Sequence, residues 1–183
     1  FEGGAVISKT AQEKEKIDRF KNFGIKNEFE ITEIGFNAKM SEFNAALGLV
    51  QLNHIENYIK DREAVYDQYL SDLHGVIGLK YIKTNGIKKK NYSYFPILIT
   101  SEYPVSRDYL YEGLRAKKIF ARKYFYPLIS NLEMYKSDIY SRGGSLANAN
   151  WAADNILCLP IYPGLSAQDI SRITSYIRSP SLL

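Results

Sequence analysis

The sequence predicts an α+β fold in which one long helix precedes a small, mainly antiparallel sheet with helices packed against it. A long helical pattern covers residues 41–73, and two strand-like segments follow at 79–83 and 92–100. Helix-start signals then occur at Ser106 and Ser166. The chain has 183 residues, 45% of them hydrophobic and 24% charged. This composition is typical of soluble globular proteins with a real core, so one domain is the default expectation.

Residues 4–8, Gly-Ala-Val-Ile-Ser, predict a buried strand at the start of the chain. A strand needs neighbours to satisfy its backbone groups, and this one would begin without a preceding partner. Phe1 is also not a start methionine. We therefore expect a fragment, either a truncated chain or the ordered remainder of a longer one.

A helix is expected after this strand, because the sequence Thr-Ala-Gln-Glu at 10–13 is a capping box. Ile17 and Phe20 would form its apolar side, and Gly24 would supply its stop. Residues 26–38 lack a clear period and predict a loop.

The helical pattern of residues 41–73 contains neither a proline nor an internal turn cluster after Gly48. Its early part, 45–49, is nearly apolar all round, whereas its later part is amphipathic with many charges. Small residues such as Ala45 and Ala46 would allow another backbone to approach closely. Core packing and a contact between subunits fit this composition equally well, so both stay open.

The strands at 79–83 and 92–100 flank an Asn-Gly pair at 85–86, a turn signal that predicts an antiparallel pair. The lysine run at 88–90 beside this turn favours a solvated loop tip over a phosphate site. Residues 119–126 are rich in aromatics and predict a short strand or extended segment.

Three helices are expected in the second half of the chain, and Pro160 and Pro163 bracket a turn before the last one. The first starts at Ser106, the second after Gly144, and the third at Ser166, which opens a capping signature. Their apolar positions are Leu110 and Leu114 in the first, Leu146, Ala149, Ala152 and Ala153 in the second, and Ile170, Ile173 and Ile177 in the third.

Charge and cysteine content exclude several classes of protein. The net charge is +4, but Lys and Arg alternate with Asp and Glu, so no basic stripe indicates nucleic-acid binding. The single cysteine, Cys158, excludes an internal disulfide and predicts a core position rather than a nucleophile. His54 and His74 lack the spacing of a metal site and predict ordinary surface or boundary histidines. The chain has neither a stretch of membrane-span length nor a signal-peptide pattern, so we expect a cytoplasmic protein without a membrane partner.

Two segments could bind an anion. Residues 35–40, Gly-Phe-Asn-Ala-Lys-Met, place Asn37 and Lys39 just before a helix start, where backbone donors and the helix dipole favour negative charge. On spacing alone, a turn with a solvated lysine is favoured. Residues 122–127, Arg-Lys-Tyr-Phe-Tyr-Pro, combine two cations with three aromatics, and on spacing alone a packed sheet edge is favoured over a ligand site.

Together, these segments resemble the sugar-nucleotide aminotransferases of the fold-type-I pyridoxal-phosphate (PLP) class, related to perosamine and 3-oxo-6-deoxyhexose transaminases. The resemblance begins with Phe-Glu-Gly-Gly at 1–4, where the family has Gly-Glu-Gly-Gly, and continues through Phe-Gly-Ile at 23–25. It is most specific over 35–42 and 45–52. It ends with Leu-Cys-Leu-Pro-Ile-Tyr-Pro-Gly-Leu-Ser at 157–166 and is closest to the 3-oxo-6-deoxyhexose enzymes.

The resemblance implies the C-terminal portion of an enzyme with PLP as cofactor, a nucleotide-linked keto sugar as substrate and glutamate as the usual amino donor. The family's Schiff-base lysine would precede Phe1, so this chain would contain no catalytic residue and be inactive alone. Relatives often carry a histidine where this chain has Leu128 and Ile129, which leaves the substrate's identity open.

The resemblance also assigns individual site residues. Asn37 corresponds to the asparagine that reaches the PLP phosphate of the neighbouring subunit in a homodimer, which reverses the interpretation from spacing alone. Lys39 is assigned to the anionic substrate or cofactor edge. Tyr124 and Tyr126 are assigned to the sugar-nucleotide pocket.

The implied organisation has three parts. Residues 1–40 would end the large PLP-binding domain, 41–75 would form a long connecting helix, and 76–183 would form the C-terminal small domain. Two alternatives stay open: a non-catalytic relative that keeps the fold as a binding or regulatory module, and a basic nucleic-acid-binding domain suggested by the charge and the tyrosines.

Overall fold

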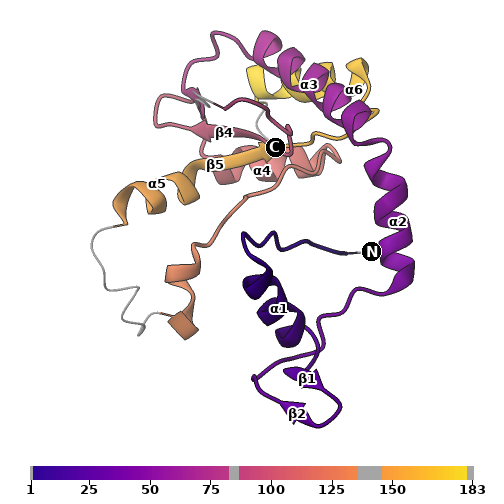
Figure 1. Ribbon diagram of the computed structural model, residues 1–183. Helices are drawn as coiled ribbons and strands as arrows, with labels where there is room; N and C mark the ends of the chain where they lie inside the picture. Colours follow the sequence, from indigo (N-terminus) through magenta and orange to yellow (C-terminus); the bar gives the residue numbers. More distant parts are fainter. Residues whose placement is uncertain (1, 83–86, 136–145, 181–183) are drawn as a thin grey trace. The chain divides into compact units, whose positions relative to one another are not determined.

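The computed structural model describes residues 2–82, 87–135 and 146–180. They fall into two compact units, 1–55 and 56–183, and each unit is described by itself (Figure 1). The predicted α+β class is confirmed, because helices pack on a small antiparallel sheet in the second unit.

The first unit begins with helix α1 (Ala11–Phe20), which has the predicted capping box. The Glu13 N–H donates to Thr10 Oγ1 at 3.1 Å, and the Thr10 N–H donates to Glu13 Oε2 at 3.2 Å. Lys21 is the C-cap. Gly24 follows in the next turn at φ 77°, so it shapes the exit of the chain rather than the end of the helix itself.

Residues 26–38 were expected to form a loop, and this expectation is wrong in part. They contribute to a hairpin of β1 (Ile25–Asn27) and β2 (Glu30–Ile31). The Asn27 side chain accepts the Phe29 N–H at 3.0 Å. Such a local bond closes a tight turn without any hydrophobic period that a sequence pattern could show.

The buried strand expected at residues 4–8 is not observed. These residues lie outside any strand, and Val6 and Ile7 are exposed. Within the described ranges, no strand pairs with them, so their backbone groups have no ladder to join.

The helix expected over residues 41–73 is in fact two helices, α2 (Glu42–Leu52) and α3 (Ile55–Asp72). The N–H groups of Asn53 and His54 donate to the carbonyls of Val50 and Gln51, at 3.2 and 3.0 Å. Bonds of this 3₁₀ type tighten the last turn and end the α-helical ladder. The prediction of one continuous helix is therefore wrong, although α3, with 18 residues, is still a long helix.

The sheet of the second unit has the order β3-β4-β5 and is antiparallel throughout. It consists of β3 (Leu79–Tyr81), β4 (Phe95–Ile99) and β5 (Ile156–Leu159). The predicted antiparallel pairing of the first two strands is confirmed. The turn predicted at 85–86 lies outside the described residues.

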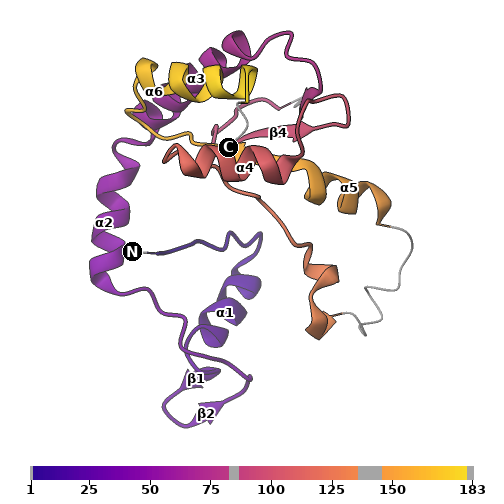
Figure 2. The same cartoon turned by 180° about the vertical axis from the view of Figure 1, so that it is seen from behind.

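Helices α3, α4 (Arg107–Ala116) and α6 (Ala167–Arg178) share one apolar core with the sheet. In Figures 1 and 2, α3 and α6 run together, and Thr174 Oγ1 donates to Asp72 Oδ2 at 3.3 Å between them. A further helix, α5 (Ala147–Asn155), leads directly into β5. The predicted apolar positions of α4 and α6 are buried in this core: Leu110, Leu114, Ile170, Ile173 and Ile177. Each such side chain stabilises the fold by about 1.5–3 kcal/mol.

Cys158 on β5 is buried as predicted, with 6% of its surface exposed, on the sheet face opposite to Leu157 and Leu159 of the core cluster. Burial raises the pKa of its thiol from 9.0 to about 11. At pH 8 this lowers the reactive thiolate fraction about a hundredfold.

We expect dithionitrobenzoate to label Cys158 slowly in the folded protein and rapidly and completely in the urea-unfolded protein. Rapid labelling without denaturant would contradict the core assignment.

Candidate functional site

The segment of residues 35–41 in the first unit is held by backbone contacts with the end of α1. Two of its N–H groups donate to the carbonyls of Phe20 and Lys21, at 3.0 and 2.9 Å. Asn37 also forms an antiparallel bridge with Asn22. These contacts fix the backbone of the segment just before α2 begins.

A glycine makes this close packing possible. A Cβ atom on Gly35 would lie 2.2 Å from the backbone nitrogen of Gly24 and 2.7 Å from the carbonyl oxygen of Phe20. Real side chains do not approach backbone atoms so closely, so position 35 requires glycine for the segment to keep this path.

Asn37 and Lys39, the two predicted site residues of this unit, both lie beside Asn22. The side chain of Asn37 is exposed. The Lys39 ammonium donates to Asn22 Oδ1 at 3.1 Å and lies 5.2 Å from the centre of the Phe23 ring. The structure thus brings the predicted pair together, and it adds Asn22, whose role no sequence signal indicated.

A hollow of about 460 Å³ lies beside Lys39 at the start of α2. Ser41 caps this helix by accepting the Asn44 N–H at 3.2 Å, and Asn44 Nδ2 donates to the Glu2 carbonyl at 2.7 Å. The other first-turn N–H groups and the ammonium of Lys39 suit an anion. Glu42 lies in the same turn, and its carboxylate repels any second negative charge that the anion carries.

The aromatic segment 122–127 of the second unit extends the sheet beyond β5. Arg122 and Cys158 exchange backbone hydrogen bonds of 2.9 and 2.8 Å. The Tyr124 and Phe125 rings stack with their centres 4.6 Å apart. The extended segment predicted for residues 119–126 is therefore confirmed at Arg122, whereas residues 124 and 125 form a turn that the bond from the Tyr126 N–H to the Lys123 carbonyl closes at 2.9 Å.

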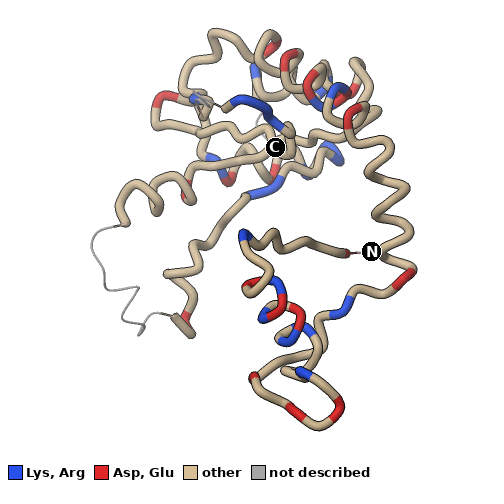
Figure 3. The backbone as a smooth tube through the Cα atoms, in the orientation of Figure 1, with Lys and Arg blue, Asp and Glu red and all other residues tan. Residues whose placement is uncertain are grey.

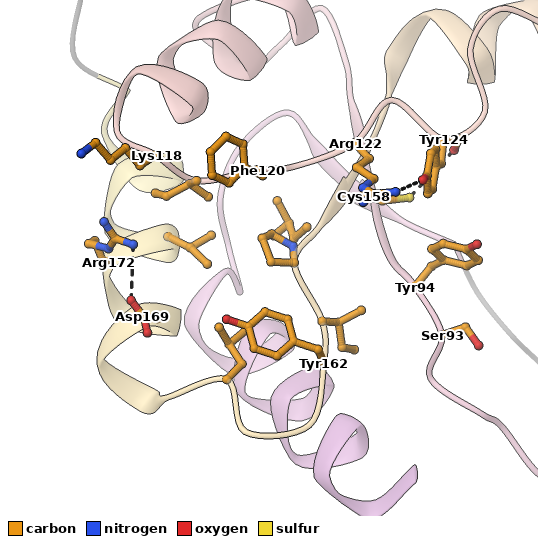
Figure 4. A pocket seen from close by; sticks show the side chains of 16 residues that line it. Ser93, Tyr94, Lys118, Phe120, Arg122, Tyr124, Cys158, Tyr162, Asp169 and Arg172 are labelled. Carbon is orange, nitrogen blue, oxygen red and sulfur yellow. Dashed lines mark hydrogen bonds and ion pairs between the residues drawn. The ribbon is translucent and has the colours of Figure 1, made fainter. Parts of the chain in front are cut away.

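Aromatic and basic side chains line a hollow of about 480 Å³ beside this segment. Figure 4 shows these side chains. The Arg122 guanidinium donates to the Tyr124 hydroxyl. The other labelled rings and cations come from Tyr94, Phe120, Tyr162, Lys118 and Arg172. Asp169 also lines the hollow and pairs with Arg172 at 3.3 Å. The remaining rings and cations suit a ligand that combines a planar ring with negative charge.

Tyr94 was not predicted as a site residue. Its ring lies 5.7 Å from that of Tyr124, edge to face. It immediately precedes Phe95, which is buried in the core, and successive strand residues point to opposite faces. This alternation was the sequence signal that could have indicated Tyr94 as a site residue.

Tyr124 and Tyr126 share a second hollow of about 670 Å³, which Tyr111 and Phe120 also line. Tyr126 is 51% exposed, and its ring centre lies 4.9 Å from the guanidinium carbon of Arg107. The structure thus brings the predicted residues together in two pairs, one in each unit.

Two features are absent from residues 2–82, 87–135 and 146–180. No helix there is long and apolar enough to cross a membrane. No group of three or more His, Cys, Asp or Glu side chains there could hold a metal ion.

Comparison with known proteins gives a family match over most of the chain. A sequence profile described as the DegT/DnrJ/EryC1/StrS aminotransferase family matches residues 1–178. The dTDP-4-amino-4,6-dideoxy-D-glucose transaminase of Escherichia coli is 49% identical over 177 residues, which cover 97% of this chain and 48% of that protein. The protein of the same name from Shigella dysenteriae is 42% identical over 178 residues, with the same coverage of 97% and 48%. The chain therefore spans about half the length of these curated relatives.

Solved structures share the fold. DesV of S. venezuelae, crystallised in complex with a ketimine intermediate, matches with a TM-score of 0.82 at 23% identity. The match covers 94% of this chain and 45% of the DesV chain. DesI, crystallised in the presence of its TDP-sugar product, has a TM-score of 0.80 at 27% identity, with coverage of 89% and 41%. These matches agree with the fold class predicted from the sequence.

Proposed function

Because the chain belongs to the DegT/DnrJ/EryC1/StrS aminotransferase family, we propose that it is the C-terminal portion of a PLP-dependent enzyme that aminates a nucleotide-linked keto sugar. The observation that carries the proposal is the 49% identity, over 97% of this chain, to a dTDP-4-amino-4,6-dideoxy-D-glucose transaminase. We accordingly propose a dTDP-linked 4-keto-6-deoxyhexose as substrate, with glutamate as amino donor. The sequence resemblance favoured 3-oxo-6-deoxyhexose enzymes, which would place the amino group on carbon 3 of the sugar. The names of the two relatives favour carbon 4.

The residues of the first unit would hold the phosphate of the cofactor. When bound, PLP supplies the electron sink for amino transfer. In the proposal, Asn37 donates its exposed amide N–H to the phosphate of the neighbouring subunit. Lys39, which Asn22 holds at 3.1 Å, adds positive charge at the same anionic edge. An amide, an ammonium and a helix start are a donor set that suits a phosphate, and this chemistry supports the assignment.

The residues of the second unit would bind the sugar nucleotide. Tyr124 and Tyr126 offer ring faces for stacking and hydroxyl groups for hydrogen bonds. Arg122 lines the same hollow as Tyr124 and offers paired donors to a phosphate. This combination supports a substrate that carries a base, a sugar and phosphates.

The three-part organisation remains part of the proposal: 1–40 as the end of the large domain, 41–75 as the connection and 76–183 as the small domain. The proposal also includes a cytoplasmic location, which the single buried Cys158 suits.

We further propose that α2 contacts a second copy of the chain. After Glu42, α2 carries no charged residue, as the uninterrupted tan tube in Figure 3 shows. Leu49 and Leu52 are 67% and 64% exposed, and none of the residues of α2 is buried. Exposed apolar surface of this kind is typical of interfaces. The half of the relatives' length that this chain does not span would also cover such a surface, so the choice between the two interpretations rests on the Leu49 test below.

The proposed reaction can be tested with the full-length protein. We expect it to show PLP absorbance and, with glutamate and dTDP-4-keto-6-deoxy-D-glucose, to yield dTDP-4-amino-4,6-dideoxy-D-glucose by mass spectrometry. A protein that purifies colourless, and stays colourless with added PLP, would overturn the proposal and favour the non-catalytic relative.

Replacing Asn37 tests the cofactor contact. Asn37→Ala removes one hydrogen bond to a charged group, which is worth about 1.5–3 kcal/mol, so PLP dissociation should become about ten- to a hundredfold easier. Dialysis followed by absorbance measures this retention. Asn27→Ala, at an exposed asparagine of the hairpin, is the matched control and should retain PLP like the wild type. Equal retention by the Asn37 variant would contradict the assignment.

Replacing Leu49 tests the subunit contact. Leu49→Asp puts a charge into the apolar surface of α2, so we expect the full-length dimer to dissociate at micromolar concentration in sedimentation velocity. Ile77→Asp is the control, because Ile77 is comparably exposed, at 75%, and belongs to the second unit. A Leu49 variant that remains dimeric would refute this interface.

A further inference from the structure

Arg107 at the start of α4 is a buried arginine, with 6% of its surface exposed. One of its terminal nitrogens donates to the carbonyls of Ala153, at 3.1 Å, and Ile156, at 3.3 Å. These carbonyls lie where α5 ends and β5 begins. A buried guanidinium is costly unless its donors are used, so these bonds hold the group in one orientation.

A carboxylate joins Arg107 to the aromatic segment 122–127. The Nε of Arg107 lies 2.5 Å from Asp108 Oδ1, and the ammonium of Lys123 lies 2.7 Å from the same oxygen. The hydrogen bond from Lys123, followed by the charge of Arg107, holds the pKa of Asp108 below its ordinary value of 3.8. Asp108 is therefore ionised at neutral pH and links the two cations.

The guanidinium also contacts the ring of Tyr126. Its central carbon lies 4.9 Å from the ring centre, within the range of a cation–π contact. Tyr126 is still 51% exposed, so the contact orients the ring and leaves much of it open to a ligand. A planar guanidinium can donate in its plane while its face packs on a ring, which a lysine ammonium cannot reproduce.

We infer that Arg107 is a positioning residue, which sets the place of Tyr126 and of the aromatic segment against β5 and thereby tunes the affinity for the sugar nucleotide. This inference rests on the function proposed for the segment. Arg107 itself is buried beneath Tyr126 and acts through it rather than on the reacting atoms.

A double-mutant cycle in the full-length, PLP-loaded protein tests the inference. The variants are Arg107→Met, Tyr126→Leu and the double variant, and the probe in isothermal titration calorimetry is dTDP, which has no sugar amine that could react with PLP. We expect each single variant to raise Kd about tenfold and the double variant to raise it no further, because Arg107 acts through Tyr126. In steady-state assays, KM for the keto sugar nucleotide should rise while kcat stays within about twofold.

Arg178→Met is the matched control for a purely structural effect. The Arg178 guanidinium also donates to carbonyls at a helix end, those of Asp72 and His74, the latter at 3.1 Å. Its described contacts are at the end of α3 rather than on the aromatic segment. This variant should lower Tm and leave Kd and KM unchanged.

Arg107→Lys covers the case in which Arg107→Met fails to fold. It keeps the charge, and we expect it to fold, to raise Kd severalfold and to increase amide hydrogen exchange in residues 122–126. Wild-type affinity in a folded Arg107 variant, or additive effects in the double variant, would overturn the inference. A different result would overturn the proposed function instead: wild-type protein that does not bind the probe, whether or not it binds PLP. In that case, the amide hydrogen exchange of residues 122–126 would still show whether Arg107 holds the segment.

Discussion

Burial of one face of the three-stranded sheet is the constraint on which the second unit depends. Phe95, Ile97 and Leu157 are almost fully buried against the helices. Because strand residues alternate between faces, the same register directs Cys158 the other way, and Tyr94 immediately precedes β4. There Tyr94 meets the ring of Tyr124, and the Cys158 thiol lies 3.8 Å from the Tyr124 carbonyl oxygen. The pattern that builds the core therefore also builds the floor of the candidate site.

The first unit is stabilised in a different way. Neither α1 nor α2 has a buried residue, so local bonds such as the capping box and the backbone contacts of residues 35–41 carry its described structure. Local bonds of this kind each contribute about 1 kcal/mol, less than a buried leucine. A unit with so little core of its own needs another surface to cover its apolar side chains, among them the exposed Leu49 and Leu52 of α2. Either a second copy or the half of the relatives' length that this chain does not span supplies that cover.

Local signals explain which elements the sequence could predict. The capping residues Thr10, Ser106 and Ser166 act on donors three residues away, so their helix starts were predicted correctly. The break after Leu52 was missed because it depends on two 3₁₀-type bonds and not on a proline or glycine. The strand expected at 4–8 was wrong because strand formation requires a pairing partner, which hydrophobicity alone does not supply.

The residues of the candidate site also divide into those that local sequence patterns indicated and those that contacts distant in sequence position. Asn37 and Lys39 drew notice on one short segment, and Tyr124 and Tyr126 on one aromatic run, but spacing alone favoured a turn and a packed sheet edge. The resemblance to the aminotransferases gave these residues their predicted roles. Arg107 was missed, because apart from the bond to its neighbour Asp108 its contacts come from residues 153 and 156 and from Tyr126, which are distant in sequence.

Such long-range contacts decide how firmly a binding side chain is held, and firm placement is what binding sites require of their supporting residues. Tyr126 owes its orientation to a buried guanidinium with at least three polar contacts, whereas the side chain of Asn37 is exposed on a segment that its backbone bonds to the end of α1 and the Lys39–Asn22 contact hold. In the proposed enzyme, the substrate side of the site would thus be ordered by the core of the second unit itself. The cofactor side would gain its final order from the neighbouring subunit, so assembly and cofactor retention should be linked.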